Sequence, residues 1–204
     1  MRFRRWETAL MIGLAVALVL GYAAQAEEVR LSEKLVRLHV IADGDGEEQQ
    51  ALKLAVRDAV LETVNPIVDG ADDRLEALER LSEALPEIEA AAKLCVASQG
   101  RDETVRVSLE QTAFPTKEYG QFALPAGDYL ALRVVLGSGK GQNWWCVVFP
   151  PLCTAASAEE FDAAAADAGL TQSEQKLITR DGESYVLKFK FLEWWGSIKQ
   201  FFGW

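Results

Sequence analysis

The stretch LVRLHVIADGDGEEQQALKLAVRDAVLETVNP, residues 35–66, changes its hydrophobic period halfway along. Its first part has the period of a β-strand with one buried face, in which Val36, Leu38 and Val40 alternate with Arg37, His39 and Ile41. After the glycines, apolar residues recur every three or four positions from Leu52 to Val64, which predicts a helix ending at Asn65 before Pro66. Asp45 is expected to cap this helix, with Glu48 three residues later.

A second helical pattern begins at Asp72 and Asp73. Its leucines recur at helical spacing, and we expect the following to face inward: Leu75, Leu78, Leu81 and Leu85. Pro86 is expected to kink or restart the helix, because proline lacks the amide proton and clashes with the preceding turn. The restarted piece, through Ile88 and Leu94, should end near Gly100.

The period then returns to two, which predicts strands. Val105, Val107 and Leu109 alternate with polar residues, and apolar residues alternate again in YLALRVVL, residues 129–136. Prolines and glycines between these segments favour turns around a short strand. NWWCVVF, residues 143–149, is apolar nearly throughout, and we expect it to lie in the sheet with both faces covered.

The glycine-rich loop GSGKGQ, residues 137–142, raises the question of a phosphate site. In a Walker A loop the lysine is followed by serine or threonine and then by a helix. Here Gly141 follows Lys140, and strand sequence follows the loop. We therefore expect a six-residue hairpin connection between the strands at 129–136 and 143–149, whose glycines tolerate positive φ.

Together these elements predict an α+β fold. We expect a mixed or antiparallel sheet of about four strands, with two or three helices packed on one face. The folded domain would span residues 27–153. A flexible connector rich in alanine and acidic residues, holding at most a short helix, would span 154–184, and an aromatic tail would span 185–204.

The first 26 residues, MRFRRWETALMIGLAVALVLGYAAQA, combine a basic start, a short apolar run and an A-x-A exit. These features are typical of a secretory signal peptide, which we expect to be cleaved after Ala26. An uncleaved membrane anchor is the alternative, since the apolar run approaches the length of the shorter spanning helices. In either case the rest of the chain is expected to be exported.

The charge of the chain excludes one class of partner. The net charge is −10, and removal of the three arginines and one glutamate of the leader makes it −12. A chain this acidic is repelled by nucleic acid and by anionic lipid head groups. We therefore expect no DNA or RNA partner.

The three cysteines, Cys95, Cys146 and Cys153, allow at most one disulfide. Cys146 and Cys153 are the expected pair, because Pro150 and Pro151 bend the chain between them and the protein is exported. Two buried reduced thiols are the alternative. A second hypothesis is an exported hydrolase in which His39 activates one of these two thiols.

Metal and cofactor sites find little support in the sequence. A zinc site would need more ligands than one histidine and an isolated Cys95 supply. DGDGEE, residues 43–48, lacks the register of an EF-hand loop, because Gly46 comes too early and position 54 is leucine. We expect no metal and no cofactor.

Aromatic side chains concentrate at the C-terminal end of the chain. A helix from about Leu187 would gather apolar residues along one side: Leu187, Phe191, Trp194, Trp195, Ile198 and Phe202. Such a surface fits an interfacial membrane helix or the groove of a partner protein. The alternative is that the tail folds back over the sheet as core.

Three stretches of the chain resemble the stage II sporulation protein R family of endospore-forming bacteria. They are LHVIADGDGEEQQALKLAVRDAV, FPTKEYGQFALPAGDYLALRVVLGSGKGQNWWCVVFPPLC and FKFLEWWGSIKQFF. The resemblance covers most of residues 35–153 and the tail, and the NWWCVVFPPLC run is long and unusual. The chain departs from the family pattern at Asp43 and Gly44, where asparagine and serine are typical.

The resemblance implies a signalling protein without catalytic activity of its own. It would be secreted from the forespore into the space facing the mother cell, where it activates a membrane-embedded aspartic protease that processes a sigma-factor precursor. We expect the protease or its membrane to contact Asn143, Trp144 and Trp145 of the strand and Phe191, Trp194, Trp195, Ile198 and Phe202 of the tail. A non-catalytic binding domain of the cell envelope is the remaining alternative.

Overall fold

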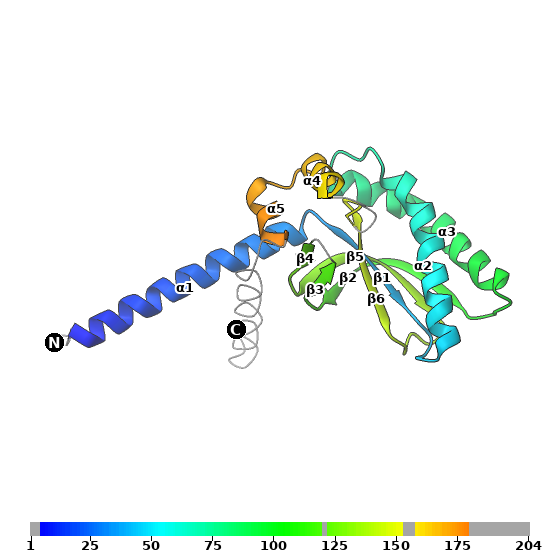
Figure 1. The fold of residues 1–204 in the computed structure, drawn as a ribbon, viewed down its shortest axis with the longest axis horizontal. Helices are drawn as coiled ribbons and strands as arrows, with labels where there is room; N and C mark the ends of the chain where they lie inside the picture. The colour runs from blue at the N-terminus through cyan, green and yellow to red at the C-terminus, as the bar shows by residue number, and fades with distance from the viewer. Residues whose placement is uncertain (1–4, 120–121, 153–157, 180–204) are drawn as a thin grey trace.

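The computed structural model describes residues 5–119, 122–152 and 158–179. The helices in these ranges are α1 (Arg5–Ser32), α2 (Glu47–Val68), α3 (Arg74–Ser98), α4 (Ala158–Asp167) and α5 (Gln172–Ile178). The strands are β1 (Val36–Ile41), β2 (Val105–Phe114), β3 (Lys117–Tyr119), β4 (Phe122–Leu124), β5 (Gly127–Leu136) and β6 (Asn143–Phe149) (Figure 1).

Four strands form one mixed sheet in the order β2-β5-β1-β6. β1 is parallel to β5 and antiparallel to β6, and β2 is antiparallel to β5. The short strands β3 and β4 form a separate antiparallel pair. Helices α2 and α3 lie against one face of the main sheet (Figure 1). The predicted α+β fold with a mixed sheet of four strands is therefore confirmed.

The predicted hairpin between β5 and β6 is wrong, because β1 lies between these two strands. The loop at 137–142 must cross two strand spacings, about 10 Å, and six extended residues reach about 20 Å. β1 takes the central place because all six of its residues are buried, which requires neighbours at both edges and cover on both faces. Gly137 and Gly139 in this loop do adopt positive φ angles.

The apolar stripe predicted for α2 is confirmed, but the predicted end of the helix is wrong. The buried apolar residues of α2 are Leu52, Val56, Val60, Val64 and Val68. The helix runs through Pro66 to Val68 instead of ending at Asn65. Proline this close to the end removes one hydrogen bond, whereas the extra turn buries Val68 in the core.

Helix α3 begins where the sequence predicts, since Asp73 accepts a hydrogen bond from the Glu76 amide at 2.9 Å. It is continuous through Pro86, so the predicted restart did not occur. The buried side chains of α3 are Ala77, Leu81, Ile88, Ala92 and Val96. Leu75, which we expected to face inward, is 72% exposed, and Leu94 is 71% exposed. Each lies two residues before a member of the buried stripe, which places it on the opposite side of the helix.

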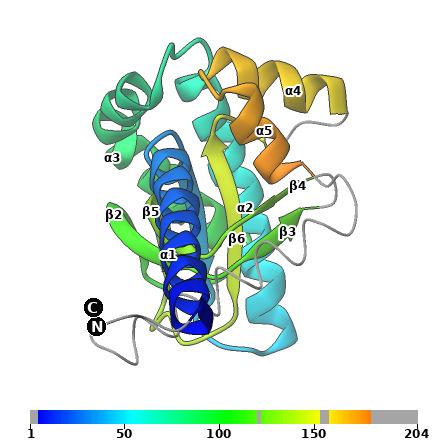
Figure 2. The ribbon, with the colours of Figure 1, turned by 90° about the vertical axis from the view of Figure 1, so that its left-hand side faces the viewer.

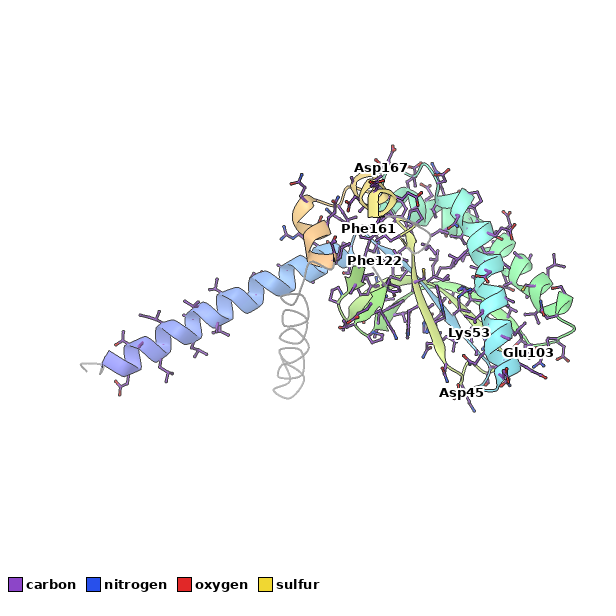
Figure 3. All side chains as sticks on the ribbon, in the orientation of Figure 1. Asp45, Lys53, Glu103, Phe122, Phe161 and Asp167 are labelled. Carbon is purple, nitrogen blue, oxygen red and sulfur yellow. The ribbon has the colours of Figure 1, made fainter. Side chains whose placement is uncertain are left out.

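The turn after β1 also differs from the prediction. Gly46, and not Asp45, precedes the first turn of α2, and the Gln49 side chain accepts a hydrogen bond from its amide. The Asp45 carboxylate instead accepts from the Gln142 amide at 2.8 Å, near the lower end of α2 in Figure 3. Asp43 accepts from the Ser138 amide in the same way. Hydrogen bonds to these two carboxylates therefore connect the turn after β1 to the loop between β5 and β6.

The segment after residue 157 contains more helix than the connector we expected. It contains two helices, α4 and α5, so the expectation of at most one short helix is wrong. Phe161 of α4 stacks on Phe122 of β4 with ring centroids 5.0 Å apart (Figure 3). Ala165 and Ile178 are fully buried in the same core. The weak apolar pattern did not predict this packing, because the buried residues of the segment include small alanines, Ala165 and Ala168, among many other alanines.

Helix α1 extends away from the sheet, and its C-terminal end joins the core through the fully buried Leu31 (Figures 1 and 2). Within the described ranges, no helix is long and apolar enough to cross a membrane. The predicted signal peptide and its cleavage after Ala26 stay predictions. The aromatic tail at 185–204 lies outside the described residues.

Replacing Leu81 by alanine tests the observed register of α3. Leu81 is fully buried, so Leu81→Ala should lower the free energy of unfolding by about 2–5 kcal/mol. The control Leu75→Ala, on the exposed side, should change it by less than about 0.5 kcal/mol. Urea denaturation followed by circular dichroism measures both. Equal losses in the two variants would contradict the observed register.

Candidate functional site

The face of the sheet away from α2 and α3 carries polar and aromatic side chains. The strand register places His39 opposite Arg133 of β5 and Trp145 of β6, so these three side chains share this face. We call the set the polar face, and its members are Arg37, His39, Glu110, Thr112, Phe114, Tyr119, Tyr129, Arg133, Asn143 and Trp145. The alternation of β1 creates it, because Leu38 and Val40 point to the helices and Arg37 and His39 point away from them.

Arg37 is the most unusual residue of the polar face, because its guanidinium is 0% exposed. No carboxylate of the described residues pairs with it, and its Nη1 has no hydrogen-bond partner there. Nη2 donates to the Tyr119 hydroxyl, and Nε donates to the Cys146 carbonyl at 3.5 Å. Burial lowers the pKa of Arg37, and the nearby Tyr119 and Tyr129 oppose that shift. Arginine nonetheless stays charged in proteins.

Aromatic rings take the place of a counter-ion for Arg37. Its Cζ atom lies 3.9 Å from the centre of the Phe114 ring and 4.8 Å from that of Tyr129. The negative π-faces of such rings attract a cation, and the attraction is strongest when the cation is desolvated. The Phe114 ring also contacts Trp145, with centroids 4.6 Å apart. Phe114 therefore connects the arginine to the aromatic surface on β6.

His39 lies beside this cluster and is only 5% exposed. Its ring stacks on Trp145 with centroids 3.8 Å apart, and its Nε2 is 2.7 Å from the Asn143 Oδ1. Burial lowers the pKa of His39 from 6.5 to about 4, although the bond to Asn143 opposes this shift. The imidazole is therefore neutral near pH 7. Because an amide oxygen only accepts, Nε2 carries the proton and Nδ1 is an acceptor.

Three buried polar atoms on this one face lack a hydrogen-bond partner among the described residues: Arg37 Nη1, His39 Nδ1 and Thr112 Oγ1. Buried polar atoms are normally paired with protein or ordered water, so a cluster of unpaired ones on one face requires an explanation, and a functional role is one such explanation. At its rim, Arg133 and Glu110 form an ion pair of 2.8 Å and remain partly exposed. The partly exposed Trp145 and the exposed Asn143 offer stacking and hydrogen bonding to a partner.

The structure brings together some of the residues predicted to bind a partner and separates others. Asn143 and Trp145 lie on the polar face, next to His39. Trp144 lies on the helix face, opposite Val40, with the Arg57 guanidinium of α2 4.8 Å from its ring centre. The five predicted tail residues, Phe191, Trp194, Trp195, Ile198 and Phe202, fall outside the described residues.

The proposed dyad of His39 and Cys146 is not assembled. Cys146 pairs with Leu38 and so lies on the helix face, on the other side of the sheet from His39. Cys146 is also disulfide-bonded, whereas Cys95 is a free thiol whose pKa is raised by burial. Cys153 lies outside the described residues, so its pairing with Cys146, and a dyad of His39 with Cys153, stay hypotheses.

Sequence reasoning found Asn143, Trp145 and His39 but missed the aromatic enclosure of Arg37. Phe114 and Tyr119 end β2 and β3, Tyr129 lies near the start of β5, and no spacing relates them to residue 37. One signal was present, namely an arginine in a strand whose other residues, apart from His39, are apolar. A fully buried arginine requires partners from elsewhere in the chain.

A separate cavity of about 450 Å³ lies between the α2–α3 turn, the segment Phe149–Pro151 and α4. Asp69, Asp72 and Asp167 are among its lining residues, and the polar-face residues are not. Within the described ranges, no three histidine, cysteine or acidic side chains are placed to hold a metal ion. The cavity is therefore not part of the polar face.

Two comparisons with known proteins found matches to this chain. The model of the family described as stage II sporulation protein R matches residues 32–159, a range that contains the whole polar face. The chain is similar to stage II sporulation protein R of Bacillus subtilis (strain 168), with 38% identity over 147 residues. That match covers 71% of this chain and 66% of the relative, just under two thirds of its length. No solved structure matches the chain.

The depressed pKa of His39 predicts a specific pH dependence of stability. Between pH 6.5 and about 4 the unfolded chain binds a proton at residue 39 that the folded chain does not, so stability falls as the pH is lowered. The contribution is about 3 kcal/mol over this window. Urea denaturation at pH 7 and pH 4 measures this loss of unfolding free energy. The loss should be smaller by about this amount in His39→Phe than in the parent protein, because phenylalanine keeps a ring against Trp145 but binds no proton. An NMR titration of His39 with a midpoint near 6.5 would contradict the expectation.

The hydrogen bond from Arg37 to Tyr119 yields a second stability test. Tyr119→Phe leaves the buried guanidinium with one partner fewer, and it should lower the free energy of unfolding by about 1–3 kcal/mol. Arg37→Met removes the charge and fills similar space. Its free energy of unfolding should therefore be higher than that of the parent protein or lie within about 1 kcal/mol of it. Denaturant titration of both variants provides the measurement. A larger loss in Arg37→Met than in Tyr119→Phe would contradict this ranking.

Proposed function

Because this chain belongs to the stage II sporulation protein R family, we propose that it is an exported sporulation signal that activates a membrane-embedded aspartic protease. The protease lies in the mother-cell membrane and processes a sigma-factor precursor. The signal passes from the forespore into the space between the two cells, and it acts by contact rather than by chemistry of its own side chains. The match of the family model to residues 32–159 and the 38% identity to the Bacillus subtilis relative support this proposal.

The observation that carries the proposal is the polar face around Arg37. Tryptophan, tyrosine and arginine are the residue types that contribute most to binding at protein interfaces. The members of these types that are partly exposed on the polar face are Trp145, Tyr119 and Arg133. The Trp145 ring is held in place before any partner arrives, because it packs against His39 and Phe114. A rigid surface of this kind loses little conformational entropy on binding. Asn143, which is exposed beside Trp145, adds a polar group at its edge.

Activation requires only that the signal bind the active arrangement of the protease better than the idle one. A preference of about 3 kcal/mol shifts such an equilibrium more than a hundredfold. A few hydrogen bonds and one stacked aromatic ring supply a difference of this size. The aromatic tail at 185–204 provides a second contact, with the protease or with its membrane.

Reconstitution tests the proposal directly. The protease and its sigma-factor precursor are combined in membrane vesicles, and the full-length protein is added. We expect cleavage of the precursor to increase. Trp145→Ala should reduce the increase about tenfold or more, as the loss of an interface tryptophan does. The matched control Trp144→Ala removes the neighbouring ring on the opposite face and should leave the increase within about twofold.

Two results would count against the proposal. The first is an unchanged rate of cleavage when the unmodified protein is added. The second is equal activity of Trp145→Ala and Trp144→Ala at matched thermal stability, since the polar face would then play no part. Circular dichroism melting of both variants controls for unfolding.

A further inference from the structure

Among the described residues, strand β2 forms one edge of the main sheet and pairs with β5 alone. It is ten residues long, contains no proline and keeps an unbroken register with β5 from Val105 to Phe114. Such a strand presents a row of backbone amides and carbonyls on its outer side. The direction in which each residue points decides which of these groups are free.

Two observations establish that direction. The Gly137 amide donates to the Thr104 carbonyl at 2.8 Å, so Thr104 points toward β5. In an antiparallel pair the orientation alternates, and the odd-numbered residues of β2 therefore point outward. In agreement, the backbone of Val107 hydrogen-bonds to Glu89 of α3, a contact that helps Lys93 hold the pKa of Glu89 below its ordinary value.

Beyond Val107 the outward backbone groups belong to Leu109, Gln111 and Ala113. They have no backbone partner among the described residues. Proteins usually protect such an edge with a proline, a bulge, a lysine or an outward charge. Both charges of β2 are instead engaged on its own sheet, where Arg106 donates to the Gly137 carbonyl and Glu110 pairs with Arg133.

We propose that residues 109–113 of β2 bind an extended segment of the partner protein, which adds one strand to the sheet. This inference rests on the proposed function, because the partner is the membrane-embedded protease. The added segment would have alternating character. It would place an apolar side chain beside the half-buried Leu109 and a polar one beside the Glu110–Arg133 pair.

The edge is continuous with the polar face. β2 ends at Phe114, whose ring packs against Arg37, His39 and Trp145. A segment paired with residues 109–113 therefore ends beside the aromatic surface, and one partner can use both. Charge favours a different protein over a second copy of this chain, since two molecules of net charge −10 repel each other.

The decisive variant is Gln111→Pro. Proline removes an amide that points away from β5, so the pairing of β2 within its own sheet is retained. Its control, Gln111→Ala, removes the side chain and keeps the amide. The full-length protein is titrated into the protease in detergent micelles, and binding and cleavage are measured together. We expect Gln111→Pro to weaken binding about tenfold or more and Gln111→Ala to stay within about twofold.

Amide hydrogen exchange gives a second reading that does not depend on the folding of a variant. In the free protein the amides of Leu109, Gln111 and Ala113 should exchange rapidly, and those of Glu110 and Thr112 slowly. Saturating protease should slow the first three by about tenfold or more. Rapid exchange in the bound state, or equal binding by Gln111→Pro, overturns the inference.

The outcomes separate this inference from the proposed function. If the unmodified protein binds without stimulating cleavage, the proposed function fails, and the exchange data and the two variants still decide the strand pairing. If it does not bind, both fail. If the three amides become protected as the concentration of the protein alone is raised, and sedimentation shows a dimer, the edge pairs with a second copy and the inference is overturned.

Discussion

A buried guanidinium on the central strand constrains much of this structure. Arg37 is fully buried without a carboxylate partner in the described chain, and transfer of an unpaired charge out of water is costly. The fold offsets that cost with the rings of Phe114 and Tyr129 and with the hydroxyl of Tyr119. These three side chains come from β2, β5 and β3. One charge therefore determines what the far face of the sheet must contain, and it ties the small β3–β4 pair to the main sheet.

The two faces of β1 have different surroundings. Leu38 and Val40 join the apolar core beneath α2 and α3, which supplies most of the stability. Arg37 and His39 face the other way, where Trp145 and Asn143 lie at the surface. A surface whose rings are already fixed by their neighbours suits a protein that acts by contact. Its relation to a sporulation signal rests on membership of the stage II sporulation protein R family.

Several differences between expectation and structure share one cause, which is that long-range burial outweighs local preference. Pro66 predicts the end of a helix and Pro86 a kink or a restart, yet α2 and α3 run on through both prolines, and Val68, Ile88 and Val96 are buried in the core. The loop at 137–142 fits a hairpin by length, but it crosses over β1. Asp45 has the character of a helix cap and bonds instead to Gln142, which lies 97 positions away. In each case the competing contact is distant in the chain.

The sequence by itself determined the kind of most elements between residues 35 and 149, since hydrophobic period and turn residues are local properties of the chain. It identified the strand at Val36–Ile41, the stripe of α2, the start of α3 near Asp73 and the family to which the chain belongs. Tertiary structure alone decided the strand order, the exposed side of α3 and the enclosure of Arg37 by rings from three strands. These depend on which surfaces meet across the core, and no spacing within a single segment encodes that meeting.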